Sequence, residues 1–352
     1  MVTTLPSART GATPPRSPLA VSTARRSGLL VALIVLLVLL CGVSLFVGSG
    51  NLPFDAVWHS LTQGGSDTTS LLVTTFRVPR MLLAVLVGTA LGLGGALMQA
   101  ITRNPLADPG LLGVNAGAYI AVVLAITYAG VAGISNYVWW SFAGAIVVTA
   151  VVYLIGGRGR AGGDPARLVL VGVSVSYLLN GISFGITLQN PDTFDAIRFW
   201  SAGSLQGRQW DIVWGVLPFI LVGSVTALAL GRSLNASALG DDLAKSLGAN
   251  LLRTRLIGFA AITVLCGAGT AAAGPITFLG LMAPFVARRI VGPDQRWILP
   301  FSAVVAPIIF LLADMVGRLL VASEVPVGLV TAFVGAPLLI VLMRSRRAAK
   351  SL

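Results

Sequence analysis

The chain has 352 residues, of which 56% are hydrophobic and only 10% are charged, and its mean hydropathy is +0.90. A soluble domain of this length has no core large enough to bury so much apolar surface, so the composition excludes a soluble globular protein. The formal net charge is +12, but the basic residues lie between apolar runs rather than in one patch, so no nucleic-acid binding is expected. Cys41 and Cys266 stand inside apolar runs and the single histidine stands alone, which predicts neither a disulfide framework nor a metal site.

The ends of the chain differ from its middle. Residues 1–27 are rich in Pro, Ser, Thr and Arg without an acid, and we expect a disordered cytoplasmic tail there. Residues 345–352 are expected to form a basic cytoplasmic tail, and residues 28–344 a single transmembrane domain. Apolar runs near the length of about 20 residues that crosses a bilayer predict an all-α membrane protein, a polytopic bundle of about ten transmembrane helices. The predicted helices are Gly28–Gly48, Pro79–Ile101, Leu112–Tyr128, Tyr137–Gly156, Arg167–Leu188, Asp211–Leu230, Arg255–Ala273, Ile276–Ile290, Ile298–Leu320 and Pro326–Met343.

The basic residues set the expected orientation. With both termini in the cytoplasm, 19 of the 24 Lys and Arg residues fall on the cytoplasmic side. This bias follows the positive-inside rule. The five expected outside are Arg77, Arg80, Arg198, Arg208 and Arg318.

The predicted spans hold few groups that could drive transport. Asp314 is the acid expected well within a span, and Arg318 follows it four residues later on the same helix face. Either the two form a local ion pair, or Arg318 acts at the outer mouth of a path. No phosphate-binding G-x-x-x-x-G-K-[ST] motif and no catalytic triad occur, so we expect a transport path that is not an enzyme. Gly88 and Gly92 are expected to serve close helix packing.

One predicted cytoplasmic segment looks like a connector. Residues 236–251 contain a short helix pattern, with Leu239, Leu243 and Leu247 forming an apolar stripe at every fourth position. Asp241 and its neighbour suit the start of this helix, and a glycine ends it. Such a helix either lies on the membrane surface or docks in a groove of a partner.

Several long stretches carry a specific resemblance. The chain resembles the FecCD family, the permease subunits of bacterial ABC importers for iron–siderophores, haem and vitamin B12. The matching stretches are FRVPR (Phe76–Arg80), GGALMQAITRNPLADPGLLGVNAGA (Gly94–Ala118), LGDDLAKSLGA (Leu239–Ala249), AGPITFLGLMAPFVARRIVG (Ala273–Gly292), LLADMVGR (Leu311–Arg318) and EVPVGLVTAFVGAPLLIVLMR (Glu324–Arg344). One departure is Phe285, which follows Pro284 where the family commonly has histidine.

The resemblance implies a type II importer fold and three kinds of partner. A second permease subunit, identical or homologous, would complete the path. Two ATPase subunits would bind ATP and Mg²⁺, so this chain itself needs no cofactor, and an extracytoplasmic binding protein would deliver the substrate. The resemblance assigns the cytoplasmic segment as the coupling helix, through Leu239, Gly240, Ala244, Leu247 and Gly248. It assigns binding-protein docking to Arg77, Arg80 and Arg318.

The resemblance also places the path along the fifth and tenth spans. Candidates for lining it are Ser174, Ser176, Asn180 and Ser183, although hydrogen bonding within or between helices explains each of them equally well. The cytoplasmic gate is expected at Asp164, Pro165 and Ala166.

These expectations combine into one function. We expect a permease of the bacterial plasma membrane that imports ferric-siderophore by alternating access. Vitamin B12 or haem is the alternative cargo within the family. An ion-coupled secondary carrier is the alternative outside it, and the scarcity of intramembrane acids argues against that reading.

Overall fold

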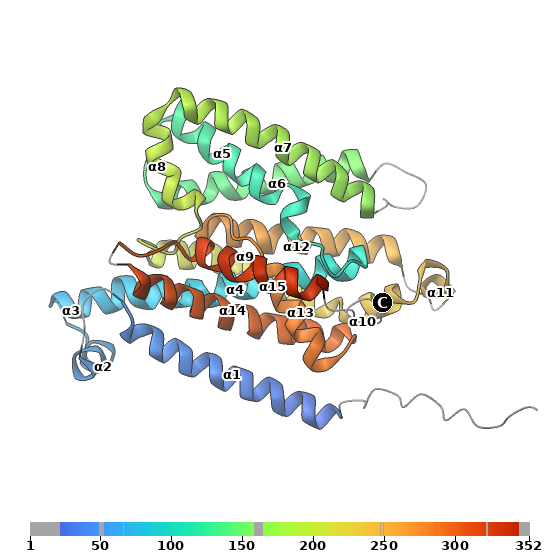
Figure 1. The fold of residues 1–352 in the computed structure, drawn as a ribbon, viewed down its shortest axis with the longest axis horizontal. Coiled ribbons are helices and arrows are strands. Elements are labelled where there is room, and N and C mark those ends of the chain that lie inside the picture. Colours follow the sequence, from blue (N-terminus) through green and yellow to red (C-terminus); the bar gives the residue numbers. More distant parts are fainter. Residues whose placement is uncertain are drawn as a thin grey trace, which may run out of the picture.

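The computed structural model describes residues 22–48, 53–65, 67–157, 165–246, 248, 250–321 and 323–344. Both predicted tails therefore lie largely outside the described residues, although residues 23–27 already belong to the first helix. Within these ranges every regular element is a helix (Figure 1). The elements are α1 (Thr23–Phe46), α2 (Phe54–Thr62), α3 (Thr68–Leu71), η1 (Leu72–Arg77), α4 (Val78–Thr102), η2 (Pro109–Leu112), α5 (Val114–Ala129), α6 (Ile134–Gly156), α7 (Pro165–Gln189), α8 (Pro191–Ser201), α9 (Trp210–Ala229), α10 (Gly231–Ala238), α11 (Asp241–Ser246), α12 (Leu251–Ala273), α13 (Leu279–Val291), α14 (Gln295–Leu320) and α15 (Val327–Arg344).

The predicted polytopic bundle is confirmed. Each of the ten predicted spans overlaps one helix, namely α1, α4, α5, α6, α7, α9, α12, α13, α14 or α15. In the part of the chain that the structure describes, seven helical stretches are long and apolar enough to cross a membrane, and among the shorter helices α5 and most of α15 are apolar as well. The sequence analysis did not predict α2, α8 or the π-helical turn η1, which extends α4 into a helical stretch from Thr68 to Thr102.

The start of α13 differs from the prediction. The span expected from Ile276 becomes helical only at Leu279, because Gly274 and Phe278 take positive φ angles of 80° and 66°. The helix has 13 residues and rises about 20 Å, less than the thickness of a hydrocarbon core. Gly274 and Ile276 are buried and Thr277 is exposed, so the non-helical backbone before α13 is only partly covered within this chain.

The helices form three groups (Figure 1). Helices α5, α6, α7 and α8 lie together at one edge of the molecule, and α1 lies at the opposite edge. The middle group is built around α4, which packs against α14, α12, α13 and α9. A Cβ on Gly88 would lie 2.5 Å from Pro307 Cα, so α4 approaches α14 more closely than any larger residue allows. The packing role expected for this glycine is confirmed.

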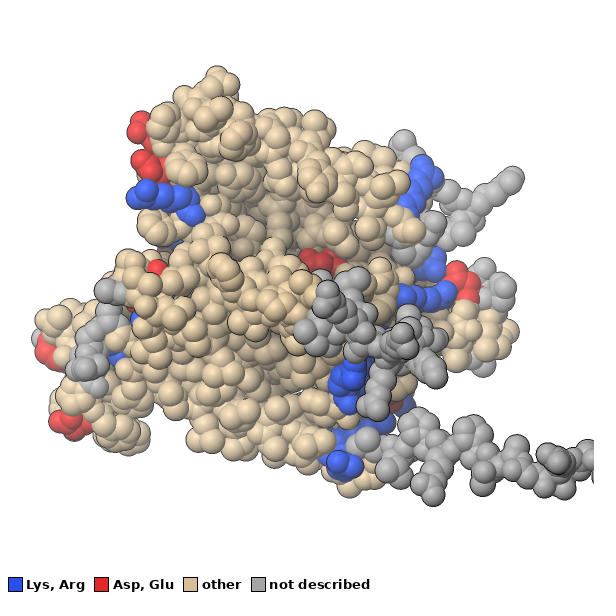
Figure 2. All heavy atoms as spheres, viewed as in Figure 1, with Lys and Arg blue, Asp and Glu red and all other residues tan. Residues whose placement is uncertain are grey.

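The charged residues gather at the two ends of the bundle. Figure 2 shows Lys and Arg concentrated at the end that carries α10 and α11 in Figure 1, and the broad band between them and the charges at the other end is mostly tan, with one acidic patch near its middle. This distribution is typical of a membrane protein whose apolar belt faces lipid.

Candidate functional site

The predicted connector is a pair of short helices. Gly240 joins α10 to α11 with φ +100°, and Gly248 follows α11 with φ +80°. A Cβ on either glycine would meet nothing within 4 Å, so backbone conformation rather than crowding favours glycine there. Leu239 and Leu243 are 57% and 52% exposed, whereas Ala244 is fully buried, and Leu247 lies outside the described residues. The exposed part of the predicted surface is therefore Leu239, Leu243 and Gly248, with Gly240 half-buried beside them.

Asp241 anchors this pair of helices to the bundle. Its Oδ1 lies 2.5 Å from Arg103 Nη2, and its Oδ2 lies 3.0 Å from Arg255 Nη2. The hydrogen bond from Arg103, together with the charge of Arg255, lowers the pKa of the Asp241 carboxyl below its usual range. A separate contact joins α10 to the start of α14, where Asn235 Nδ2 donates to Asp294 Oδ1 at 2.6 Å.

The three arginines assigned to docking meet at the opposite end of the bundle, beside the end of α1. Arg77 Nη1 donates to the carbonyl of Leu45 at 2.7 Å, and Arg318 Nη1 donates to the carbonyls of Ser44 and Val47 at 3.0 and 2.9 Å. These carbonyls lie beyond the last hydrogen bonds of α1, where cations are favoured. Arg77 and Arg318 therefore cap α1 and are largely buried.

Two acids complete this arginine cluster. Arg80 Nη2 lies 2.8 Å from Asp314 Oδ1, and Arg80 Nη1 lies 2.7 Å from Glu324 Oε2. Arg318 pairs with the other oxygen of Asp314, so the ion pair predicted within α14 is confirmed. The sequence analysis missed the role of Glu324 and the α1 carbonyls, because those partners are far apart along the chain. The arginines thus already have partners within this chain.

The candidate path residues lie on different faces of α7. Ser174, Ser176 and Ser183 donate to the carbonyls of Leu170, Gly172 and Leu179, each four residues earlier, at 2.7 to 2.9 Å. This confirms the interpretation that these hydroxyls bond back to their own helix. Ser183 is fully buried, whereas Ser174 and Asn180 lie on the exposed face of α7.

The expected gate falls partly outside the described residues. Asp164 lies outside them, Pro165 is the first residue of α7, and Ala166 is exposed.

The connection between α4 and α5 packs inside the bundle, although no role was predicted for it. Residues 104–113 return into the bundle, where Asp108 Oδ1 accepts a hydrogen bond from the Gly110 amide at 2.8 Å. A Cβ on Gly172 of α7 would clash with the Leu111 carbonyl, so this connection packs tightly against α7. The Pro and Gly residues of the NPLADPGLLG stretch were the available signal for a non-helical entry.

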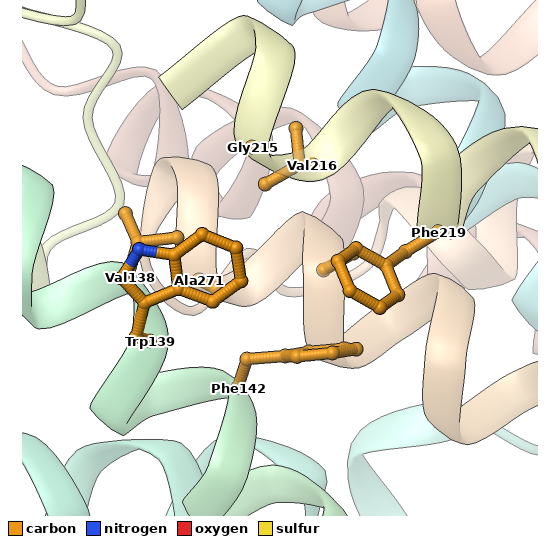
Figure 3. Close-up of a pocket in the computed structure, with 8 residues that line it drawn as sticks. Val138, Trp139, Phe142, Gly215, Val216, Phe219 and Ala271 are labelled. Atoms are coloured by element: carbon orange, nitrogen blue, oxygen red, sulfur yellow. The ribbon is translucent and has the colours of Figure 1, made fainter. Parts of the chain in front are cut away.

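An apolar crevice between α6, α9 and α12 is lined by Val, Trp, Phe, Gly and Ala residues. Figure 3 shows Trp139 and Phe142 of α6 facing Phe219 of α9, with Ala271 behind them. The Phe142 and Phe219 ring centroids are 4.7 Å apart, which is ordinary aromatic packing. Among the described residues, no three His, Cys, Asp or Glu side chains gather in a way that could hold a metal ion.

Comparison with known proteins decides the family. The model of the FecCD transport family matches residues 35–345, nearly the whole described bundle. The chain belongs to this family. As a FecCD permease it is a transport component, without catalysis of its own.

Individual relatives align with this FecCD permease over most of their lengths. The ferric enterobactin transport system permease protein of Escherichia coli (strain K12) is 46% identical over 314 residues, which cover 89% of this chain and 94% of the relative. An iron(3+)-hydroxamate import system permease protein of Bacillus subtilis (strain 168) is 38% identical over 92% of this chain and 86% of the relative. A solved structure described as an inward-facing conformation of a metal-chelate type ABC transporter aligns with a TM-score of 0.80 and 28% identity, covering 90% of this chain and 99% of that one.

Proposed function

We propose that this chain is the permease subunit of an ATP-driven importer for ferric siderophores. The observation that carries the proposal is the 46% identity to a ferric enterobactin permease over 94% of that protein's length. The likeness to a metal-chelate transporter over nearly the whole of its chain supports the same class of cargo. The chelate crosses intact, so the permease needs a wide path with weak contacts rather than a catalytic site.

The proposed assembly has four further subunits. A second permease subunit would complete the path, two ATPase subunits would bind ATP and Mg²⁺, and a binding protein would deliver the chelate from outside. We place the ATPase contact on α10 and α11, where Leu239 and Leu243 are exposed and the flanking glycines leave room for close approach. An exposed apolar stripe on a short helix is the pattern by which helices dock in grooves.

The binding protein would dock at the arginine cluster of Arg77, Arg80 and Arg318. These residues already hold Asp314, Glu324 and the end of α1. Acidic groups of the binding protein would therefore meet a cluster of three arginines that is already paired with two acids. To bind Arg80, such a group would have to displace Glu324. Such contacts steer and orient a partner more than they add affinity.

The exposed face of α7 is the proposed wall of the path. Ser174 and Asn180 lie on it beside Tyr177, which is 77% exposed. The tight contact between residues 104–113 and α7 would pass movement at the cytoplasmic end to this wall, and residues 164–166 would close it during alternating access.

The orientation follows from charge. The basic residues at the α10 and α11 end support a cytoplasmic location for that end, and with ten spans both termini would be cytoplasmic in a bacterial plasma membrane.

The cargo is tested by uptake of ⁵⁵Fe in a strain whose copy of this gene is deleted and restored. We expect the restored gene to rescue uptake of a ferric catecholate. A ferric hydroxamate is tested as a second chelate. Labelled haem and cobalamin are the matched alternatives, and rescue of either without rescue of a ferric chelate would contradict the proposal. Uptake that continues without ATP would contradict the proposal that the importer is driven by ATP.

A further inference from the structure

The carboxylate of Asp241 joins the cytoplasmic segment to two membrane helices. Arg103, at 2.5 Å, is the C-terminal cap of α4, and Arg255, at 3.0 Å, lies in the second turn of α12. The three residues come from three separate elements. A single acid therefore ties α11 to both α4 and α12.

Arg103 also holds the other side of the bend between the two short helices. The same Nη2 that meets Asp241 lies 2.5 Å from the carbonyl of Ser237, in the last turn of α10. Gly240 forms the bend between them; a Cβ there would meet nothing within 4 Å, and its amide donates to the Ser237 carbonyl at 3.3 Å. The guanidinium thus adds a side-chain contact that holds α10 and α11 together across this bend.

Arg103 stands where movement of this segment would enter the bundle. Its backbone is left-handed, with φ 51° and ψ 32°, a conformation that few residues other than glycine, asparagine and aspartate adopt. It ends α4 and begins residues 104–113, the connection that packs against Gly172 of α7. A pull on the Arg103 side chain would therefore act on α4 and on this connection together.

We infer that Asp241 is a positioning residue that makes the α10–α11 segment move with α4 and α12 as one body. The inference rests on the proposed function, in which the ATPase subunits push on this segment. A segment attached only through glycine bends would absorb that displacement. A segment held by two cations passes it to the membrane helices, so Asp241 acts on the coupling of hydrolysis to transport rather than on ATP hydrolysis.

The test uses the complete transporter, with its partner subunits, in proteoliposomes supplied with a ⁵⁵Fe catecholate. ATP hydrolysis and ⁵⁵Fe uptake are measured together for Asp241→Asn and Arg103→Gln. We expect both variants to retain the ATPase subunits and to hydrolyse ATP within about twofold of the wild type, while uptake per ATP falls about fivefold, as the loss of a partly exposed charge network would give. Arg103→Lys keeps the positive charge but loses the planar guanidinium that meets two acceptors at once. Its uptake per ATP should lie between those of the wild type and Arg103→Gln.

The control is Arg296→Gln. Arg296 pairs with Asp294 at 2.9 Å within one turn at the start of α14, and the glutamine variant leaves in place the separate hydrogen bond from Asn235 of α10 to Asp294. Its removal should leave uptake per ATP unchanged.

A distance measurement keeps the inference testable where uptake is lost. Spin labels at Ser246 of α11 and Leu256 of α12, both exposed, should give a broader distance distribution in Asp241→Asn than in the wild type. An unchanged distribution, unchanged uptake per ATP, or loss of the ATPase subunits from Asp241→Asn would each overturn the inference. If the wild-type chain retains no ATPase, the proposed function fails instead.

Discussion

Arg80 and Asp314 lie 234 residues apart in the chain and form a two-pronged salt bridge between α4 and α14. The Nη2–Oδ1 distance is 2.8 Å, and Nε lies 3.2 Å from both oxygens. Asp314 is 1% exposed and also pairs with Arg318. An acid at this depth is costly unless it is paired, and here two guanidinium groups neutralise it.

Asp314→Asn should destabilise the permease strongly. It leaves Arg80 and Arg318 buried without their shared counter-charge, a change that costs roughly 3–5 kcal/mol at buried pairs. Thermal unfolding of the purified protein in detergent measures the effect. Asp195→Asn is the control, because the Asp195–Arg198 pair is exposed on α8 and its loss should change stability by about 1 kcal/mol or less. Equal melting temperatures for the two variants would contradict this account of Asp314.

Glu324→Gln should tighten docking of an acidic binding protein. The substitution removes one of the two acids that compete for Arg80, which keeps its salt bridge with Asp314. We expect affinity to rise about two- to fivefold at low salt and the difference to disappear near 1 M salt, where charges are screened. Titration of the purified binding protein against the permease at two salt concentrations measures it. An unchanged or weaker affinity at low salt would remove Arg80 from the proposed docking site.

Gly88→Ala should weaken the contact between α4 and α14. A Cβ at Gly88 would lie 2.5 Å from Pro307 Cα, and backbone cannot move aside easily, so a loss of about 1–3 kcal/mol is expected. Gly181→Ala in α7 is the matched control, since a Cβ there meets nothing within 4 Å and alanine favours helix. The prediction fails if the two variants unfold at the same temperature.

The contact between α10 and α14 should depend on pH in a defined range. The hydrogen bonds from Arg296, with a further one from Asn235, lower the pKa of Asp294 to about 2. A carboxyl whose pKa is lower in the folded state stabilises above its unfolded pKa near 4, and this stability is lost as the pH falls from about 4 towards 2. Unfolding measured across this range should show a slope that Asp294→Asn reduces. An identical slope in the variant would exclude Asp294 as its source.

Apolar runs were sufficient to predict the bundle, because a bilayer leaves few other ways to satisfy the backbone. The start of α13 was missed since positive φ at Phe278 has no simple sequence signature. The α10–α11 segment could be located from Gly240, Gly248 and the leucine stripe, but the burial of Ala244 could not be predicted, because it depends on packing. The i,i+4 pair of Asp314 and Arg318 was predictable, whereas Arg80 and Glu324 are joined only by the tertiary fold. The serines of α7 could not be assigned from the sequence either. A hydroxyl within a span can line a polar path or donate a hydrogen bond to a carbonyl of its own helix.

The most direct test of the central claim is uptake by purified components. The permease, reconstituted with its second permease subunit, ATPases and binding protein, should accumulate a ⁵⁵Fe catecholate only when ATP is present and the binding protein is outside. Uptake by this chain alone, driven by an ion gradient and indifferent to ATP, would contradict the claim that it is the path of an ATP-driven importer.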